Sequence, residues 1–218
     1  MANRFYRACL RETVGTNMSF HCQYGMGYST NVDKAHVYSL DEAQRSWECG
    51  RDIDLPISAD AIDAATVWHV DHQYIPGTNV ITPGCNEYVA FMKGRWNGND
   101  VFWLSDTLPT DDFSKVRVYA KPDESQSELV WMPFAMADSQ KRRTFSIDLL
   151  NRRTMIQGAG LRMPEWLKKQ RRRKGSSGKT RWNCPGCGKI SWQDNPYDFE
   201  GCRDLSCDEW KPKYEVQP

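Results

Sequence analysis

The sequence predicts an α+β protein with two small β-rich modules that contain short helices, then a basic helical segment and a small cysteine-containing module. Three observations carry this prediction. Short runs that alternate apolar and polar residues are separated by Gly, Pro and Asn turn signals, which is typical of strands in hairpins. The order of these runs recurs along the chain, and four cysteines stand in two pairs near the C-terminus. We place the parts at residues 1–76, 86–137, 138–181 and 182–212.

The first module opens with two strands that are joined by a tight turn. The turn signal is Val14-Gly15-Thr16-Asn17, and apolar and polar residues alternate on both sides of it. Further along, Ser39-Leu40-Asp41-Glu42 has the form of a capping box, in which the serine side chain bonds a backbone N–H and the glutamate reaches back. The predicted elements are strands at 5–10, 18–22, 35–38 and 66–75 and helices at 40–49 and 58–65.

The second module repeats this order of elements after a linker that Pro76-Gly77 and Pro83-Gly84 bound. A diverged duplication explains the repeated order, and coincidental hairpin chemistry is the alternative. The offset is about 82 positions, with one deletion. The coincident pairs are Tyr6 and Tyr88, Ala8 and Ala90, Asn17 and Asn99, Phe20 and Phe102, Lys34 and Lys115, Val37 and Val118, and Tyr38 and Tyr119.

Four short patterns stand out in the first 75 residues. They are Phe5-Tyr6, Val14-Gly15, the G-x-G-Y-x-T-N run from Gly25 to Asn31, and the D-K-A-x-V run from Asp33 to Val37. In these patterns the opening resembles small uncharacterised proteins of bacteriophages and mobile elements. The resemblance implies an origin of that kind and carries no activity with it.

The formal net charge of +1 conceals an uneven distribution of charge. Residues 1–137 contain 11 Lys and Arg against 18 Asp and Glu, residues 138–183 contain 14 against 3, and residues 184–218 contain 4 against 7. Such asymmetry is typical of chains that contact nucleic acid with one part only, and it also permits the acidic part to fold back on the basic part. In the basic part we expect two helices, at 144–157 and from Pro164 to 174, and a flexible tether at 175–178.

The cations next to the cysteines are the candidate nucleic-acid-binding residues. Arginine side chains fit phosphate oxygens two at a time, and each docked cation releases counterions. Trp192, between the cysteine pairs, offers a ring that can stack on an unpaired base. The alternative is a solvated cationic helix, and the acidic residues among the cysteines favour a protein contact there. The candidates are Lys168, Lys169, Arg171, Arg172, Arg173, Lys174, Lys179, Arg181 and Trp192.

The four C-terminal cysteines form the most specific motif in the chain. Cys184 and Cys187 read C-x2-C, and Cys202 and Cys207 follow as C-x4-C. Two turns that each carry two thiolates place four sulfurs at the corners of a tetrahedron, which Zn²⁺ accepts. We therefore predict one structural zinc ion, with disulfides or unliganded thiols as the alternatives. Short strands are expected at 189–192 and 197–199, around a turn at 194–196.

Residues 182–210 resemble a zinc ribbon. The likeness lies in Cys184-Pro185-Gly186-Cys187-Gly188, which fits the family's C-P-x-C-G pattern. The second pair departs from the family, because four residues rather than two separate Cys202 from Cys207. This departure puts the geometry of the second turn in question more than its metal.

No catalytic motif is found, and we expect no enzymatic activity. Gly178-Lys179-Thr180 is similar to the end of a phosphate-binding loop, but Arg173 stands where the first glycine is required. His69, Asp71 and His72 do not converge on a strand, because His72 points to the opposite face. A hydrolase built on paired carboxylates stays open. No apolar run has membrane-spanning length and no signal peptide follows Met1, so we expect a cytoplasmic protein without a membrane partner.

Two functions fit these observations best. The first is a zinc-containing, non-enzymatic protein of phage or mobile-element type that binds DNA or RNA through its basic segment. The second is an inhibitor or adaptor that acts on a host transcription or defence complex, with the acidic modules mimicking nucleic acid. A third, weaker hypothesis is an enzyme whose site lies in the duplicated modules.

Overall fold

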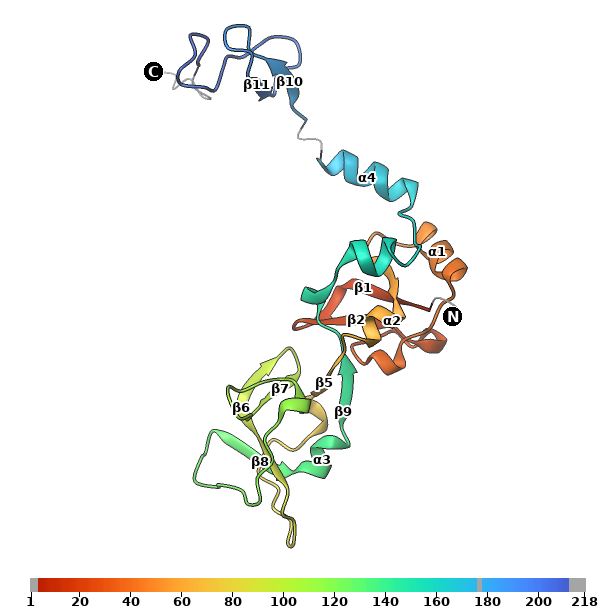
Figure 1. The fold of residues 1–218 in the computed structure, drawn as a ribbon, viewed down its shortest axis with the longest axis vertical. Coiled ribbons are helices and arrows are strands. Elements are labelled where there is room, and N and C mark those ends of the chain that lie inside the picture. The colour runs from red at the N-terminus through yellow and green to blue at the C-terminus, as the bar shows by residue number, and fades with distance from the viewer. Residues whose placement is uncertain (1–3, 176–177, 212–218) are drawn as a thin grey trace. The chain divides into compact units, whose positions relative to one another are not determined.

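The structure is a computed structural model that describes residues 4–175 and 178–211, without the side chains of residues 173–175. The chain divides into two compact units, Met1–Pro164 and Glu165–Pro218, which we call the first and the second unit. Small antiparallel sheets and short helices make up both (Figure 1), so the predicted α+β class is confirmed.

The first half of the first unit is a four-stranded antiparallel sheet with the strand order β3-β2-β1-β4. The predicted hairpin is confirmed, because β1 and β2 pair around the turn that contains Gly15. The strand expected at 35–38 is wrong, because only single bridges form there, at Ala35 and Tyr38. The strands are β1 (Phe5–Val14), β2 (Asn17–His21), β3 (Tyr28–Ser29) and β4 (Asp54–Ser58), with the short 3₁₀ helices η1 (Gln23–Gly25) and η2 (Val32–Lys34).

Two helices cap this half of the unit at the positions that the sequence predicted. Helix α1 (Leu40–Glu48) begins with the expected capping box, since Ser39 accepts from the Glu42 backbone and Glu42 accepts from the Ser39 backbone. Helix α2 (Ala59–Asp63) begins at Ser58, whose side chain accepts from the Ala61 N–H. The buried residues Ala43 and Trp47 of α1 and Ile62 of α2 face the core.

The second half of the first unit contains a three-stranded sheet with the order β7-β6-β8. A two-stranded sheet, β5 paired with β9, belongs to neither half alone. The remaining elements are β5 (Val67–Val70), η3 (His72–Tyr74), β6 (Tyr88–Asn97), β7 (Asp100–Trp103), η4 (Phe113–Lys115), β8 (Leu129–Pro133), α3 (Phe134–Asp138), β9 (Lys141–Thr144), η5 (Ile147–Leu149) and a π-helical turn, η6 (Arg153–Gln157).

The order and the lengths of the elements repeat within the first unit. We call residues 5–74 the first repeat and residues 88–149 the second repeat. The strand registers repeat as well, since Ala8 pairs with Phe20 as Phe91 pairs with Trp103, and Cys9 pairs with Asp54 as Met92 pairs with Leu129. Corresponding elements are β1 and β6, β2 and β7, η2 and η4, β4 and β8, α2 and α3, β5 and β9, and η3 and η5.

The offset predicted for the paired strands is wrong by one residue. Phe5 corresponds to Tyr88 and Asn17 to Asp100, which is an offset of 83, whereas Lys34 and Lys115 correspond as predicted. A shift of one residue turns every side chain of a strand to the opposite face, so identical residues at the wrong offset do not share an environment. The identity of Ala8 and Ala90 favours the offset of 82, although these two residues do not correspond in the structure.

The two repeats exchange their last strands. Val70 of the first repeat and Ile75, which directly follows that repeat, lie in the core of the second, beside Val101, Trp103 and Phe113. In the reverse direction, the N–H of Met18 donates to the carbonyl of Phe145, whose ring is fully buried. Strands β5 and β9 lie side by side between the two larger sheets (Figure 1). Each repeat therefore completes its core with a segment of the other.

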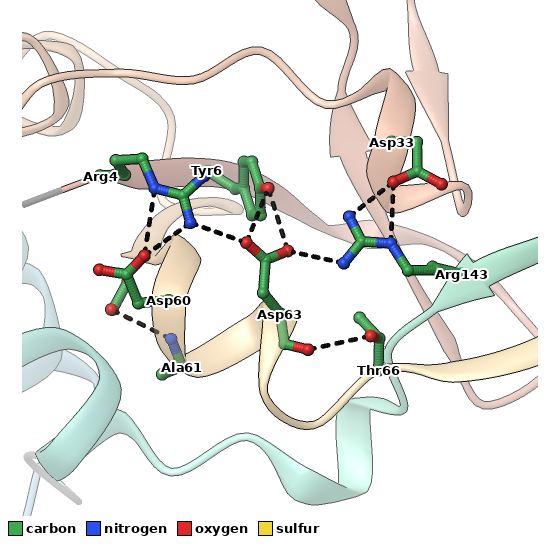
Figure 2. A network of polar contacts seen from close by, with 9 residues as sticks. Arg4, Tyr6, Asp33, Asp60, Ala61, Asp63, Thr66 and Arg143 are labelled. Carbon is green, nitrogen blue, oxygen red and sulfur yellow. Dashed lines mark hydrogen bonds and ion pairs between the residues drawn. The ribbon is translucent and has the colours of Figure 1, made fainter.

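Arg143 of β9 anchors the exchanged strand to the first repeat. Its guanidinium lies 2.6 Å from Asp33 and 3.3 Å from Asp63, and Arg4 holds the other side of Asp63 at 2.9 Å (Figure 2). Of the helix predicted at 144–157, only the end forms, as the π-helical turn η6 that Gly158 ends, whereas Thr144 belongs to β9. The residues around 141–144 gain cross-strand bonds and acidic partners as a strand, which a free helix does not offer. The cations of β9, Lys141, Arg142 and Arg143, therefore neutralise acidic residues of the first unit.

A buried polar cluster lies where the two repeats meet. Asp100 has no exposed surface, and it accepts from the Asn17 side chain at 2.6 Å and pairs with Arg142 at 2.7 Å. His69 Nδ1 lies 2.9 Å from the same carboxylate and 2.9 Å from the Thr144 hydroxyl. Asn17 and Asp100 are corresponding residues of the two repeats. An amide facing a carboxylate can donate to it, whereas two carboxylates here would repel each other.

The two hairpin turns of the repeats also meet, and neither has room for a side chain. A Cβ on Gly98 (φ +63) would lie 2.5 Å from the backbone N of Gly15, and one on Gly15 (φ +60) would lie 2.5 Å from the N of Gly98. The two turns can come this close only because neither glycine has a side chain, so that one backbone packs directly on the other. The left-handed conformation is also strained for any other residue.

Gly98→Ala is expected to destabilise the first unit by about 2–4 kcal/mol, because it combines backbone strain with a clash against fixed backbone atoms. Urea unfolding followed by far-UV circular dichroism measures this effect. Gly84→Ala is the matched control, since Gly84 also has a positive φ of +79 but no atom within 4 Å of a Cβ. Equal losses in both variants would contradict the close contact of the two turns.

Candidate metal centre

The second unit places its first cysteine pair in the turn of a hairpin. Strands β10 (Thr180–Asn183) and β11 (Ile190–Gln193) pair in antiparallel register, and Cys184 and Cys187 lie between them. The expected strand at 189–192 is confirmed within a residue, whereas the one at 197–199 is wrong. There the side chain of Asn195 accepts from the N–H groups of Tyr197 and Asp198, which bends the chain into a turn.

The second cysteine pair lies on a loop that turns tightly despite its longer spacing. Asp204 organises this loop, because its side chain accepts from the N–H and the hydroxyl of Ser206 and its carbonyl accepts from the N–H of Cys207. Cys202 donates its N–H to the carbonyl of Glu209. The extra two residues are thereby absorbed in a turn, and both sulfurs of this pair face the first pair.

Gln193 of β11 fixes the second loop against the hairpin. Its side chain is almost fully buried, donates to the Gly201 carbonyl at 2.6 Å and accepts from the Glu200 N–H at 2.6 Å. Lys189, just after the first pair, forms an ion pair with Asp204 of the second loop. The two cysteine turns are thus connected by polar contacts rather than by an apolar core.

The four cysteine sulfurs come together as one group. All lie within 4.8 Å of one another, and Cys184 to Cys207 and Cys187 to Cys202 are each 3.6 Å apart. A tetrahedral ion with sulfur ligands at about 2.3 Å requires edges of roughly 3.8 Å, which is close to these spacings. The group could therefore hold a metal ion, and the geometry that C-x4-C put in question is compatible with it.

Backbone N–H groups point at two of the sulfurs. The N–H of Cys187 lies 3.5 Å from the sulfur of Cys184, and that of Asp204 lies 3.4 Å from the sulfur of Cys202. The first contact is the main reason why the pKa of Cys184 falls to about 7. At Cys207 the Glu209 N–H acts to lower the pKa, but burial and the neighbouring thiols outweigh it and raise the pKa to about 12. Four crowded thiols share protons, and a cation can replace those protons.

Of the predicted nucleic-acid-binding cations, Lys179 directly precedes β10, Arg181 lies on β10, and the others lie on α4 (Glu165–Gly175). The helix was predicted at this place and is confirmed. Lys169, Arg171 and Arg172 are exposed, whereas Lys168 is half-buried and lies 2.5 Å from Glu165. The side chains of Arg173 and Lys174 lie outside the described residues, as does part of the tether at 175–178.

One face of the β10–β11 hairpin is exposed and carries both a cation and an indole ring. Arg181 is the cross-strand partner of Trp192, and Asn183 is the partner of Ile190. Trp192 is 57% exposed and Ile190 is 55% exposed, although both are large apolar side chains. Lys179 lies to the side, 4.0 Å from Asp194. The structure therefore brings Arg181 and Trp192 together on paired strands.

Among the described residues, no other group of three or more metal-ligating side chains converges. The sequence pattern did not place His69 in a buried cluster, yet its Nδ1 lies 2.9 Å from the carboxylate of Asp100. The sequence does contain a signal for this cluster. Asn17 follows the turn glycine Gly15 in the first repeat, and Asp100 follows the corresponding turn glycine Gly98 in the second. Only the offset of 83 brings those turns into correspondence.

No protein-family model matches the chain, and neither a curated protein nor a solved structure matches it. The resemblance of the opening to phage proteins therefore stays a prediction. None of the helices in residues 4–175 and 178–211 is both long and apolar enough to span a membrane. The side chains of the two units are therefore the available guide to function.

Proposed function

We propose that the second unit is a zinc-stabilised module that binds nucleic acid, without catalytic activity of its own. One observation carries the proposal, namely the exposed pair of Arg181 and Trp192 on a hairpin that the cysteine group clamps. A guanidinium pairs with a phosphate oxygen while an indole ring stacks on an unpaired base. A protein gains nothing in stability from leaving that ring in water.

Zinc is the ion that the donor set favours. Four cysteine thiolates in a near-tetrahedral group are typical of Zn²⁺ or of iron–sulfur clusters, and hard cations such as Mg²⁺ prefer oxygen ligands. Sulfur-to-sulfur distances of 3.6 Å suit a single ion. One structural Zn²⁺ would be held by Cys184, Cys187, Cys202 and Cys207.

The electrostatics of the same region support a phosphate ligand. Residues 165–183 contain eight Lys and Arg and one acidic residue, Glu165. Its position in the first turn of α4 matches the helix dipole, and it pairs with one of these cations, Lys168. The neighbouring acidic residues Asp194 and Asp204 are each near a lysine of this unit. A polyanion therefore meets a locally positive surface.

Replacing Arg171, Arg172 and Arg173 together by alanine is expected to weaken binding to single-stranded DNA or RNA at least tenfold at 100 mM salt. Each lost phosphate contact should also reduce the slope of log K against log salt by about 0.7 for a single strand. Fluorescence anisotropy with a labelled oligonucleotide at several salt concentrations measures both. Trp192→Ala should weaken binding with little change of slope, because stacking releases no counterions.

Arg45→Ala in the first unit is the matched control for a lost cation, since Arg45 is exposed and stands on α1. It should leave both affinity and slope unchanged. Wild-type protein that binds no oligonucleotide at low salt, or binds with an affinity independent of salt, would overturn the proposal.

The second candidate function is an inhibitor or adaptor that binds a host protein complex. It is favoured by the excess of acidic residues in residues 1–137, with 18 Asp and Glu against 11 Lys and Arg. An acidic surface can occupy a cleft that otherwise binds nucleic acid. Two results together would favour this candidate. A protein partner remains bound in stoichiometric amount after nuclease treatment, and the protein shows no nucleic-acid binding through Arg181 and Trp192.

A further inference from the structure

The first repeat contains an open cavity of about 520 Å³. Its walls include Arg7, His21, Tyr24, Tyr28, His36 and Tyr38. The volume falls within the range of about 300–1,000 Å³ that is typical of small-molecule sites. Rings and one guanidinium dominate the lining, so its chemistry is unlike that of an apolar packing defect.

A chain of charged groups extends from the cavity into the protein. Arg7 Nη2 lies 2.7 Å from His21 Nδ1, and His21 Nε2 lies 3.0 Å from Asp54 Oδ1. Because a guanidinium only donates, His21 Nδ1 must accept and its Nε2–H must donate to Asp54. The imidazole is then neutral, and burial lowers its pKa although Asp54 acts to raise it. Arg51 holds the other side of Asp54 at 3.0 Å and 2.9 Å.

The second repeat shows which residues the same fold accepts at the corresponding positions. The residues that correspond to Arg7, His21 and Asp54 are Ala90, Leu104 and Leu129. There, Ala90 and Leu129 pack with Trp131 in an apolar cluster that Leu104 and Tyr119 extend. The same backbone arrangement therefore forms with an apolar set. The charged set in the first repeat is an addition that the fold does not require.

Burying these charged groups costs folding free energy unless other interactions offset their loss of hydration. The Asp54 side chain is only 7% exposed, and burying charges removes them from water. Burial alone would raise the pKa of Asp54, but the hydrogen bonds from Arg51 and His21 outweigh it and hold the pKa below its ordinary value. Nε of Arg7 is buried and has no hydrogen-bond partner among the described residues. Arg7 therefore carries a buried donor that its neighbours do not use, which adds to the cost of placing a guanidinium here.

The loop over the cavity is also strained in a way that exposes a ring. Tyr24 is the one residue other than glycine with a positive φ among the described residues, at +57°, and its side chain is 91% exposed. The N–H of Cys22 bonds the carbonyl of Gly27, and Arg51 donates to the Tyr28 hydroxyl at 2.7 Å, so both ends of the loop are fixed. Strain of this kind is commonly retained where a side chain contacts a ligand.

We propose that this cavity is a binding site for an anion attached to a flat ring, such as a nucleoside monophosphate. The fork of Arg7 binds the anion, and the rings of Tyr24, Tyr28 and Tyr38 contact the base. The charges of Arg7, Arg51 and Asp54 leave the site with a surplus of one positive charge, because His21 is neutral. The site lies in the first unit and does not depend on the metal or on α4.

The ligand has two sources that share this chemistry, a free nucleotide and the phosphorylated end of a strand. Calorimetric titration of the full metal-loaded chain with the four ribonucleoside 5′-monophosphates tests the first, and a 5′-phosphorylated trinucleotide tests the second. At least one of these ligands should bind at least about tenfold more tightly than inorganic phosphate or the unphosphorylated nucleoside, because it uses both halves of the site. Tighter binding of the trinucleotide than of the monophosphates assigns the strand end.

Substitution by the residues of the second repeat gives variants that the fold tolerates. Arg7→Ala, and the combined variant Arg7→Ala, His21→Leu, Asp54→Leu, should unfold at or above the wild-type denaturant midpoint and bind at least about tenfold more weakly. Tyr24→Gly should retain the loop, since glycine favours its conformation, and should weaken binding about tenfold through lost stacking.

Arg11→Ala is the matched control, because Arg11 stands on the same strand, is largely exposed and bonds only Glu12 among the described residues. It should bind as the wild type does. Absence of binding by any nucleotide at millimolar concentration, equal affinity for phosphate and for every nucleotide ligand, or an unchanged affinity in Arg7→Ala would each overturn the proposal. Loss of oligonucleotide binding in the α4 variants with nucleotide binding retained separates this site from the proposed function.

Discussion

Removal of the metal that we propose for the cysteine group is expected to unfold residues 178–211 and to leave the first unit folded. Within these described residues the only buried apolar side chains are those of Cys184 and Cys202, which are themselves candidate ligands. Ser191 and Gln193 are buried with them, and polar side chains do not form an apolar core. Structural zinc contributes an apparent free energy of about 10–16 kcal/mol at pH 7, which no other interaction in this segment replaces.

Nuclear magnetic resonance of the amide groups measures this effect residue by residue. On addition of a strong chelator, the signals of 178–211 should collapse to random-coil positions while those of the first repeat stay in place. Cys207→Ser should produce the same spectrum without chelator, and native mass spectrometry should show one zinc ion per wild-type chain. Cys49→Ser, at an exposed cysteine of the first unit, is the control and should change neither. A dispersed spectrum after chelation would contradict a metal-clamped unit.

Asp100→Ala is expected to destabilise the first unit by about 3–5 kcal/mol. The carboxylate has no exposed surface, and Arg142, its partner at 2.7 Å, is only 11% exposed. Removing Asp100 leaves the buried cation of Arg142 largely uncompensated, with only the more distant carboxylate of Asp71 at 3.7 Å, and this costs more than the pair contributes. Asn17 loses the acceptor of its amide in the same variant, and His69 loses a polar neighbour.

Urea unfolding monitored by tryptophan fluorescence reports this loss, since Trp103 and Trp131 are buried in the second repeat. Asp106→Ala is the control, because Asp106 is 83% exposed and lies 3.5 Å from Arg117, so its loss should cost less than about 1 kcal/mol. Adding Arg142→Met to Asp100→Ala should recover part of the stability, because it removes the uncompensated cation. If Asp100→Ala unfolds at the wild-type midpoint, the cluster does not hold the repeats together.

Local features of the sequence predicted local features of the structure. The capping box at Ser39 and Glu42, the hairpin around Gly15 and the helix after Pro164 are each determined by residues within four positions of one another. The cysteine group was predictable for a different reason. Its spacing reflects ligand geometry, so the pattern survives even where the intervening strand at 197–199 was wrong.

The features that were missed depend on residues far apart in the chain. Lys141, Arg142 and Arg143 were expected to precede a helix that begins at Thr144, but β5 and the acidic residues of the first repeat make residues 141–144 a strand. No pattern within 141–157 indicates that Asp33 and Asp63 lie nearby. Likewise, the role of Arg7 becomes evident only when the register of the repeats shows that Ala90 occupies the same position.

The exchanged strands constrain the order in which the first unit can be made. The first repeat cannot close its core until Phe145 has left the ribosome, since that ring belongs to the far end of the unit. Until then, the nascent chain exposes Met18 and Phe20, which are fully buried in the finished protein. We therefore expect the first repeat to complete its core only late in synthesis, and a chain that stops inside the second repeat to expose apolar surface that favours aggregation.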